Sequence, residues 1–336
     1  MKNLKCWFES YTLIFRKPAG TSRGVLFTKK TYFIYLQQEE QTFVGEANLF
    51  ENLSFDDVFG YENYLRQACQ QIENQSFEWE EWRRFPSIQF AAEQILIQQK
   101  NQKNILFNSE FVKGEKGIPI NGLIWMSSPE EMQRQIEEKL KQRFHCIKLK
   151  IGVHWEKEKQ ILQSLRNKFS AEKLELRVDA NGAFNLEEAK EVLKYLKALE
   201  IHSIEQPIRQ GFKTEMKKLC AMGECAVALD EELIGITGKT EKQSLLQEIK
   251  PQFIILKPAL VGGFQGSLEW IDLAKKNNIG WWITSALESN IGLNAIAQFT
   301  ASLDTAIPQG LGTGGLFTNN IESDLEIRGE KLYKKC

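Results

Sequence analysis

Short apolar runs recur at a steady interval along the second half of the chain, and each is followed by a longer stretch with helical patterning. A strand together with its crossover helix occupies about this interval, so the pattern predicts successive βα units of a parallel barrel. The stretches expected to form barrel helices are 129–143, 155–169, 186–199, 213–222, 240–248 and 266–277.

One of these runs shows how the two faces of a predicted strand differ. Ile147, Leu149 and Ile151 share one face, and Lys148 and Lys150 share the other. The outer face of a barrel strand packs against helices while the inner face lines the lumen. We therefore expect both lysines to point inward.

Five charged residues stand at or near the ends of the apolar runs. They are Lys150, Asp179, Glu205, Asp230 and Lys257, at intervals of 29, 26, 25 and 27 residues. Because the C-terminal ends of barrel strands meet at one face, these side chains are expected to converge into a ring. Three carboxylates between two lysines predict a divalent-metal site with two groups that can exchange protons.

The first 118 residues do not follow this rhythm and predict a separate α+β domain. The expected elements are antiparallel strands over 11–15 and 31–35, joined by a loop over 18–26, and helices over 56–74 and 86–99. Ser54 is a candidate N-cap for the first helix. A cluster of large aromatic and basic side chains is expected to pack in the core or at a domain interface. It consists of Trp79, Trp82, Arg83 and Arg84.

The predicted fold is α/β, a modified (β/α)7β barrel with an N-terminal α+β capping domain. The domains are a cap over 1–118, a barrel over 119–316 and a C-terminal segment over 317–336 that returns to the cap. The first barrel strand is placed within 118–125 and the seventh over 280–285. The glycine-rich stretch 310–315 takes the eighth position, which makes Gly312 a candidate for the lumen.

Size and composition narrow the function classes. A chain of 336 residues exceeds the size at which one core usually keeps growing, in agreement with two domains. Its 43 Lys+Arg and 44 Asp+Glu give a net charge of −1, so neither nucleic acid nor a membrane is an expected partner. No run resembles a signal peptide or a membrane span. Six scattered cysteines without a Cys-x-x-Cys pair favour reduced thiols in the cytoplasm.

The ring of carboxylates has ligands typical of Mg²⁺ or Mn²⁺ rather than zinc. The histidines His145, His154 and His202 stand away from the metal positions. A cation flanked by lysines suits removal of a proton next to a carboxylate, because the resulting enediolate carries negative charge on oxygen. Lys148, about 7 Å along the strand from Lys150, adds a like charge that favours a neutral base.

Several short motifs surround these residues. They are Lys148-Leu149-Lys150, Arg177-Val178-Asp179-Ala180-Asn181, Ile204-Glu205-Gln206-Pro207, Leu229-Asp230-Glu231 and Leu256-Lys257-Pro258. In these motifs the chain resembles the Lys-x-Lys branch of the enolase superfamily, in which a lysine base works beside Mg²⁺. Within that branch it is most similar to the o-succinylbenzoate synthase family. The segments that carry this second similarity are 18–24, 85–87, 285–289 and 310–314.

The resemblance implies a role for each candidate residue. Lys150 would be the general base and then the acid, next to Lys148, and Lys257 would stabilise the enediolate from the opposite face. The ligands of Mg²⁺, which Mn²⁺ could replace, would be Asp179, Glu205 and Asp230. The substrate, a small carboxylate, would be bound by Arg177, Asn181, Ser285 and Gly312, and by Thr21, Ser22 and Arg23 of a closing loop near 18–26.

The reaction that the resemblance implies is a hydro-lyase reaction. It is the Mg²⁺-dependent syn dehydration of 2-succinyl-6-hydroxy-2,4-cyclohexadiene-1-carboxylate to 2-succinylbenzoate in menaquinone biosynthesis.

Other activities on this scaffold stay open. N-succinylamino acid racemisation and dipeptide epimerisation would use both lysines, although dipeptide epimerases typically place Asp-x-Asp where this chain has Gly312-Thr313-Gly314. A muconate cycloisomerase-like activity is also compatible with the motifs. A binding or regulatory protein without catalysis is disfavoured, because no ligand or lysine of the set is missing. The sequence does not define the oligomeric state.

Overall fold

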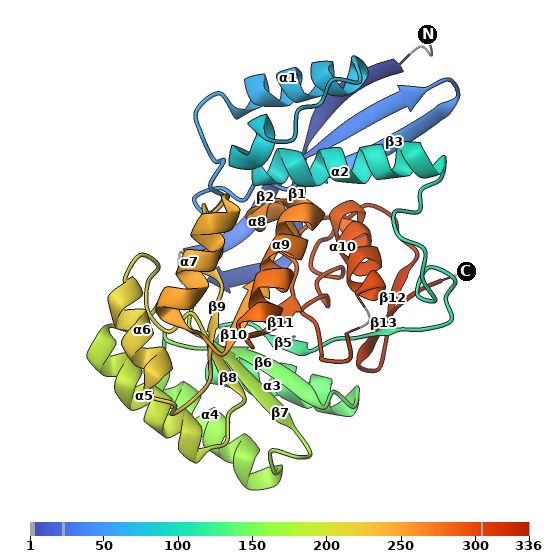
Figure 1. The fold of residues 1–336 in the computed structure, drawn as a ribbon. Coiled ribbons are helices and arrows are strands. Elements are labelled where there is room, and N and C mark those ends of the chain that lie inside the picture. The colour runs from blue at the N-terminus through green and yellow to red at the C-terminus, as the bar shows by residue number, and fades with distance from the viewer. Residues whose placement is uncertain (1–3, 22–23, 304, 336) are drawn as a thin grey trace.

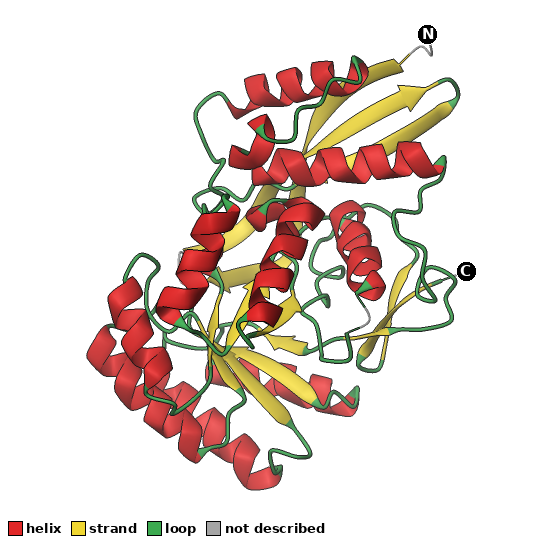
Figure 2. Ribbon diagram, in the orientation of Figure 1, coloured by secondary structure: helices red, strands yellow, loops and turns green. Residues whose placement is uncertain are grey.

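The computed structural model describes residues 4–21, 24–303 and 305–335. An antiparallel sheet with two helices forms one end of the molecule, and a curved parallel sheet surrounded by helices forms the other (Figure 1). Figure 2 shows that the helices of the second part lie outside the strands. No helix within these ranges is long and apolar enough to cross a membrane.

The capping domain contains a three-stranded sheet and two main helices. Its elements are β1 (Leu4–Thr21), β2 (Gly24–Gln38), β3 (Gln41–Ala47), α1 (Tyr61–Glu73), the 3₁₀ helix η1 (Glu81–Arg84) and α2 (Pro86–Asn101). The sheet order is β1-β2-β3, with antiparallel pairing throughout. Alternate residues of β2, including Ile34 and Leu36, are buried against both helices because successive side chains of a strand point to opposite faces.

The hairpin formed by β1 and β2 is longer than the sequence predicted. Most of the expected loop over 18–26 continues the two strands, and Thr21 pairs with Gly24 after a register shift between Ile14 and Ala19. A bulge of this kind keeps a long ribbon paired while it bends.

The predicted start of the first cap helix was wrong. Residues 56–60 form turns, and α1 begins only at Tyr61, after Gly60 in a left-handed conformation with φ 76°. Ser54 does not cap this helix, because its hydroxyl accepts a hydrogen bond from the Phe50 amide at 2.8 Å.

The barrel contains seven hydrogen-bonded parallel strands in the order β11-β10-β9-β8-β7-β6-β5. The strands are β5 (Gly122–Ile124), β6 (Cys146–Lys150), β7 (Glu175–Asp179), β8 (Ser203–Glu205), β9 (Val227–Leu229), β10 (Phe253–Leu256) and β11 (Gly280–Ile283). The eighth position lies at Gln309 and Gly310, which form single parallel bridges to Ile120 on one side and Thr284 on the other. These two bridges join the edges of the sheet.

Helices follow the strands, and the longer ones cover the outside of the sheet (Figure 2). They are α3 (Pro129–Lys141), α4 (Trp155–Lys168), α5 (Leu186–Ala198), α6 (Lys213–Ala221), η2 (Glu231–Leu233), α7 (Lys239–Ile249), α8 (Pro258–Val261), α9 (Gly263–Lys276) and α10 (Asn290–Ser302). The outward-facing aliphatics of the strands, such as Ile147, Leu149 and Val178, join the main hydrophobic core beneath these helices. A separate small cluster of Ala228, Ile255 and Trp282 lies on the inner face of the sheet.

The chain segments at the ends of the barrel differ from the prediction. The expected first strand over 118–125 is divided, because β4 (Ile118–Pro119) pairs with the C-terminal hairpin and only β5 joins the barrel. That hairpin consists of β12 (Leu325–Arg328) and β13 (Lys331–Lys334).

Residues 316–318 lie against the cap before this hairpin begins. Leu316 and Thr318 exchange backbone hydrogen bonds of 2.8 Å with Arg16 and Ile14 of β1. The segment after the eighth barrel position therefore contacts the cap first and then returns to the barrel.

The aromatic and basic cluster near residue 80 lies at the base of the cap. Trp82 is buried in the cap core, whereas Arg83 forms an ion pair of 3.2 Å with Glu269 of α9. Trp79 is more exposed and packs edge-to-face against Phe77. The expected packing in the core and at the domain interface therefore holds for Trp82 and Arg83, whereas Trp79 and Arg84 are exposed.

Candidate active site

A cavity opens at the C-terminal ends of the barrel strands, beneath the cap. Many of its lining residues belong to the set that the sequence singled out: Lys148, Lys150, Asp179, Asn181, Lys257, Ser285 and Gly312. Strand register explains part of this convergence, because Lys150 is paired with Asp179 and Asp179 with Glu205 across β6, β7 and β8. Neighbouring strands thus place three charged side chains at one level.

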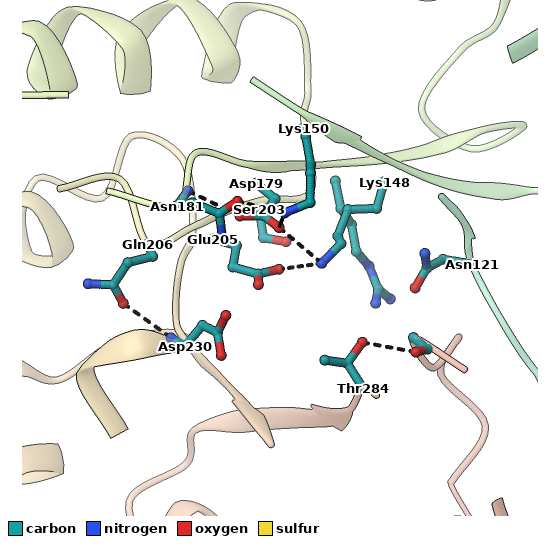
Figure 3. Close-up of polar contacts among 12 residues, drawn as sticks. Asn121, Lys148, Lys150, Asp179, Asn181, Ser203, Glu205, Gln206, Asp230 and Thr284 are labelled. Carbon is teal, nitrogen blue, oxygen red and sulfur yellow. Dashed lines mark hydrogen bonds and ion pairs between the residues drawn. The ribbon is translucent and has the colours of Figure 1, made fainter. Parts of the chain in front are cut away.

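Both lysines of β6 point into the lumen (Figure 3). The Lys150 ammonium lies 3.0 Å from Asp179 Oδ2 and donates to Asn181 Oδ1 at 2.6 Å. The Lys148 ammonium bridges Glu205 Oε2 at 2.8 Å and Asp179 Oδ2 at 3.3 Å. Although burial opposes its charge, these two carboxylates raise the pKa of Lys148 above its usual value. Lys148 is therefore held as a cation beside Lys150.

Lys257 lies across the lumen from this pair. Three strands separate β10, which it follows, from β6 in the sheet. Its ammonium forms a close ion pair with Asp230. Burial opposes the charge, but Asp230 and Glu205 outweigh it and raise the pKa of Lys257.

The three predicted metal ligands are almost fully buried and differ in their electrostatics. Burial and the neighbouring Asp179 carboxylate raise the pKa of Glu205 to about 7. Burial also raises the pKa of Asp230, which Lys257 counteracts. For Asp179 burial acts in the same direction, yet Lys150 and Lys148 hold its pKa below the usual value. At Glu205 and Asp230 the neighbouring lysines therefore do not fully offset the effect of burial on the carboxyl pKa.

The donor set suits a hard divalent cation. Glu205 Oε1 is buried and has no hydrogen-bond partner among the described residues, and a cation would satisfy it. In this structure the other Glu205 oxygen is paired with the Lys148 ammonium, and one Asp230 oxygen is paired with that of Lys257. As placed here, the described residues contain no group of three or more His, Cys, Asp or Glu side chains arranged to hold a metal ion. The fit to Mg²⁺ therefore rests on oxygen chemistry and on the unpaired Glu205 oxygen.

Arg177 does not line the cavity, although the sequence predicted that it would contact substrate. Its side chain is buried deeper in the lumen, where it donates to Glu175 at 2.7 Å and to the Pro308 carbonyl at 2.9 Å. The guanidinium also stacks over Trp282 at 4.4 Å from the ring centroid. Its inward direction was predicted correctly. The side chain contacts residues inside the barrel, two positions before Asp179 on the same strand, and does not reach the cavity.

Asn181, Ser285 and Gly312 lie on three sides of the cavity. Asn181 has a left-handed backbone, with φ 44°, and its amide donates to Glu231 at 3.1 Å. The Ser285 hydroxyl lies 2.6 Å from that of Thr313. The wall at Ser285, Gly312 and Thr313 therefore presents hydroxyl groups and backbone to the cavity, and none of these three residues has a carboxylate.

The predicted closing loop is described only in part. Thr21 ends β1, while Ser22 and Arg23 lie outside the described residues. Gly20 forms an antiparallel bridge with Met126, which follows β5. A second cavity of about 750 Å³ runs under Pro18 and Ala19 and shares four lining residues with the first. The end of β1 therefore lies beside the candidate active site.

Several lining residues were not predicted. They are Phe50, Leu53, Asn121, Leu123, Trp125, Glu231, Thr284, Ala286, Leu287, Gly310 and Thr313. Strand alternation could have predicted Asn121 and Leu123, which share one face at β5. It could also have predicted Thr284, which is two residues after Trp282 and therefore shares its inner face. Phe50 and Leu53 come from a cap loop, and no periodic pattern marks them. The Trp125 ring lies 5.9 Å from the Lys150 ammonium and gives this lysine an aromatic neighbour.

Comparison with known proteins identifies the fold family. The family described as enolase C-terminal domain-like matches residues 131–329. The o-succinylbenzoate synthase of Desulfotalea psychrophila is 44% identical over 99% of this chain and 99% of its own length. The chain belongs to the o-succinylbenzoate synthase family of the enolase superfamily. It is an enzyme of that family, a hydro-lyase, and the predicted resemblance is confirmed.

Solved structures support the same placement. The crystal structure of MenC from Desulfotalea psychrophila matches with a TM-score of 0.83 and 40% identity, over 98% of this chain and 99% of that one. The predicted α/β barrel with a capping domain is thereby confirmed. The N-succinylamino acid racemase of Thermus thermophilus is 31% identical over 49% of this chain and 42% of its own length.

Proposed function

We propose that this enzyme catalyses the Mg²⁺-dependent syn dehydration of 2-succinyl-6-hydroxy-2,4-cyclohexadiene-1-carboxylate to 2-succinylbenzoate in menaquinone biosynthesis. The observation that carries the proposal is one cavity with a lysine on each side, in a chain that matches an o-succinylbenzoate synthase along nearly its whole length. We expect the enzyme to act in the cytoplasm on this small carboxylate, without nucleic acid or membrane as a partner.

Lys150 is the group that moves the protons in this proposal. Its amine lies at the cavity beside Asn181 and Asp179, and it removes the proton next to the substrate carboxylate. The same residue then returns the proton to the departing hydroxyl group, since a syn elimination places both on one face. Asn181 and Asp179 hold the amine in place between these two transfers.

Lys257 supplies positive charge on the other side of the cavity. As an ammonium it stabilises the negative charge that develops on the substrate carboxylate when the proton leaves. Its raised pKa keeps it charged at neutral pH. A Mg²⁺ ion held by Asp179, Glu205 and Asp230 would neutralise further charge on that carboxylate. In this proposal the Lys257 ammonium and the metal would together stabilise the negative charge on the substrate carboxylate.

An assay of the purified enzyme tests the proposal directly. Dehydration makes an aromatic ring, so conversion of the cyclohexadiene substrate can be followed by its change in ultraviolet absorbance. We expect turnover that depends on added Mg²⁺ and that is absent in Lys150→Ala. Absence of turnover in the well-folded, Mg²⁺-loaded enzyme would reject the proposal.

N-succinylamino acid racemisation is the second candidate. Lysines on both sides of the cavity would allow a proton to leave from one face and return on the other. Incubation of single enantiomers in deuterium oxide separates the two activities, because racemisation incorporates solvent deuterium at the α-carbon of the product. Dipeptide epimerisation has less support, because Thr313 and Ser285 form the wall where epimerases would bind an ammonium group. A muconate cycloisomerase-like activity stays open.

A further inference from the structure

The wall of the cavity contains a loop in an unfavourable backbone conformation. Ser285, Ala286 and Leu287 line the cavity between β11 and α10. Leu287 has φ 60°, a left-handed conformation that costs a non-glycine residue roughly 1–3 kcal/mol and persists only where the surroundings impose it. The contacts that impose it must therefore come from residues packed against this loop.

The Leu287 amide donates to the Ser285 hydroxyl at 3.3 Å, and its side chain belongs to an apolar cluster with Leu13 and Phe15 of β1. Two further residues, one of the barrel and one of the cap, hold the peptide that precedes Leu287. Glu288 Oε2 accepts a hydrogen bond from the Ala286 amide at 2.7 Å. The side-chain amide of Asn48, just after β3, donates to the Ala286 carbonyl and to Glu288 Oε1, both at 3.0 Å. Asn48 and Glu288 are fully buried. The carboxamide of Asn48 thus ties the loop to the cap.

A second layer of cap residues holds Asn48 and the loop in turn. The ammonium of Lys29, on β2, donates to Asn48 Oδ1. Burial lowers the pKa of Lys29, which the nearby carboxylates of Glu46 and Glu288 counteract. Glu46 accepts hydrogen bonds from the Ser289 amide at 2.9 Å and the Ser289 hydroxyl at 2.6 Å. The loop is therefore anchored just after the strained residue as well.

We propose that Asn48 is a positioning residue that sets the shape of the substrate cavity from the cap. Its carboxamide fixes the Ala286 peptide and the Glu288 carboxylate, and these fix Leu287 in its left-handed conformation against the cavity. Asn48 does not line the cavity itself. This role of Asn48 does not depend on which small carboxylate the cavity binds. Its test is therefore independent of the test of the proposed dehydration.

Asn48→Ala is the first test. We expect kcat/KM for the substrate turned over by the wild type to fall roughly 10-fold or more, mainly through KM, while the Mg²⁺ concentration for half-activation stays unchanged. Hydrogen exchange provides a readout without substrate, and the Ala286 and Leu287 amides should exchange faster in the variant. If Asn48→Ala does not fold, Asn48→Asp keeps the side-chain volume and the acceptor for Lys29 but removes the donor, and the same results are expected.

Glu93→Gln is the matched control. Glu93 is also a buried cap residue that bonds to barrel backbone, at the Phe264 and Gln265 amides of α9, which do not line the cavity. Its kcat/KM and the exchange of the 285–289 loop should remain at wild-type values. Equal kinetic losses in both variants would mean that any loosening of the domain interface has this effect, and would overturn the proposal.

A double-mutant cycle with Leu287→Gly separates positioning from general stability. Glycine adopts positive φ at little cost, so the loop then needs less support from Asn48. The loss caused by Asn48→Ala should be several-fold smaller in the Leu287→Gly background than in the wild type. Equal losses in the two backgrounds, or unchanged kinetics and exchange in Asn48→Ala, would show that Asn48 does not position this loop.

Discussion

Lys150 and Lys257 face the same cavity from strands that are separated by three others, and each forms an ion pair with a different carboxylate. Lys150 contacts Asp179, and Lys257 contacts Asp230. Only Lys150 has an amide oxygen, that of Asn181, as a further acceptor. The two lysines therefore occupy different environments, which suits different roles.

Lys150→Ala and Lys257→Arg distinguish these roles. Loss of the group that moves protons should lower kcat by roughly 10²–10⁴-fold or more in Lys150→Ala. Lys257→Arg keeps the positive charge, so part of the dehydration activity should survive, whereas racemisation should be lost because arginine does not readily release a proton. Steady-state kinetics on both substrates measure this. Complete loss of dehydration in a folded Lys257→Arg protein would contradict a purely electrostatic role.

Removal of the metal should abolish activity and lower stability. Mg²⁺ at about 100 times its Kd should stabilise the native enzyme by roughly 2.7 kcal/mol, because a ligand that binds only the folded state shifts the equilibrium. Thermal unfolding with Mg²⁺ and with a chelator measures the shift. Asp230→Asn removes one predicted ligand, so its midpoint should respond little to Mg²⁺. Full activity after exhaustive chelation would exclude the metal site.

Glu93 gives the enzyme a pH-dependent stability. Burial raises the pKa of this carboxyl to about 8, despite the two amides of α9 that donate to it. Between the unfolded pKa near 4.5 and the folded value near 8, the folded state binds more protons. Stability from this group therefore falls as pH rises, by about 2 kcal/mol from pH 6 to pH 8.

The glutamine variant isolates that contribution. Glu93→Gln cannot ionise, so it should match the wild type near pH 6 and be more stable than the wild type near pH 8.5. Urea unfolding at the two pH values gives the difference. A wild type and a variant with parallel pH profiles would mean that Glu93 is ionised throughout the range.

Gly20→Ala should disturb the contact between the end of β1 and the barrel. A Cβ at Gly20 would lie 2.9 Å from the Met126 carbonyl oxygen, which is too close for an unshifted backbone. We expect a several-fold lower kcat/KM with a small change in thermal midpoint, because the hairpin end is displaced from the cavity. Gly24→Ala is the control for substitution in the same hairpin, since no atom of the described residues beyond its chain neighbours lies within 4 Å of its Cβ position. Its positive φ of 127° predicts a cost in stability instead.

The central part of the site could be predicted because it depends on local geometry. Alternation fixes which side chains of a strand face the lumen, and a regular βα interval brings strand ends to one face. These two rules placed Lys148, Lys150, Asp179 and Lys257 at one cavity. Alternation also put Arg177 on the inner face, but its contact with substrate was expected from the resemblance alone. Its side chain instead turns toward Glu175 and the Pro308 carbonyl, away from the cavity.

Contacts between distant parts of the chain could not be predicted. Glu46 and Ser289 are 243 positions apart, and no periodicity links them. The start of α1 depends on Gly60 and on the contacts of Ser54 with the Phe50 amide, which compete with capping. The division of the first barrel strand likewise follows from pairing of Ile118 with Leu332 near the other end of the chain.

Two glutamates of the cap accept hydrogen bonds from backbone amides in the first turns of two barrel helices. Glu93 accepts from the backbone of α9, and Glu46 accepts from the Ser289 and Gly292 amides at the start of α10. A Cβ at Gly292 would lie 2.8 Å from Glu46 Oε2, so a glycine at this position leaves room for the Glu46 carboxylate. A barrel expressed alone would expose helix ends whose donors have lost their acceptors. We therefore expect that the two domains must be kept together when the chain is divided or recombined with a relative.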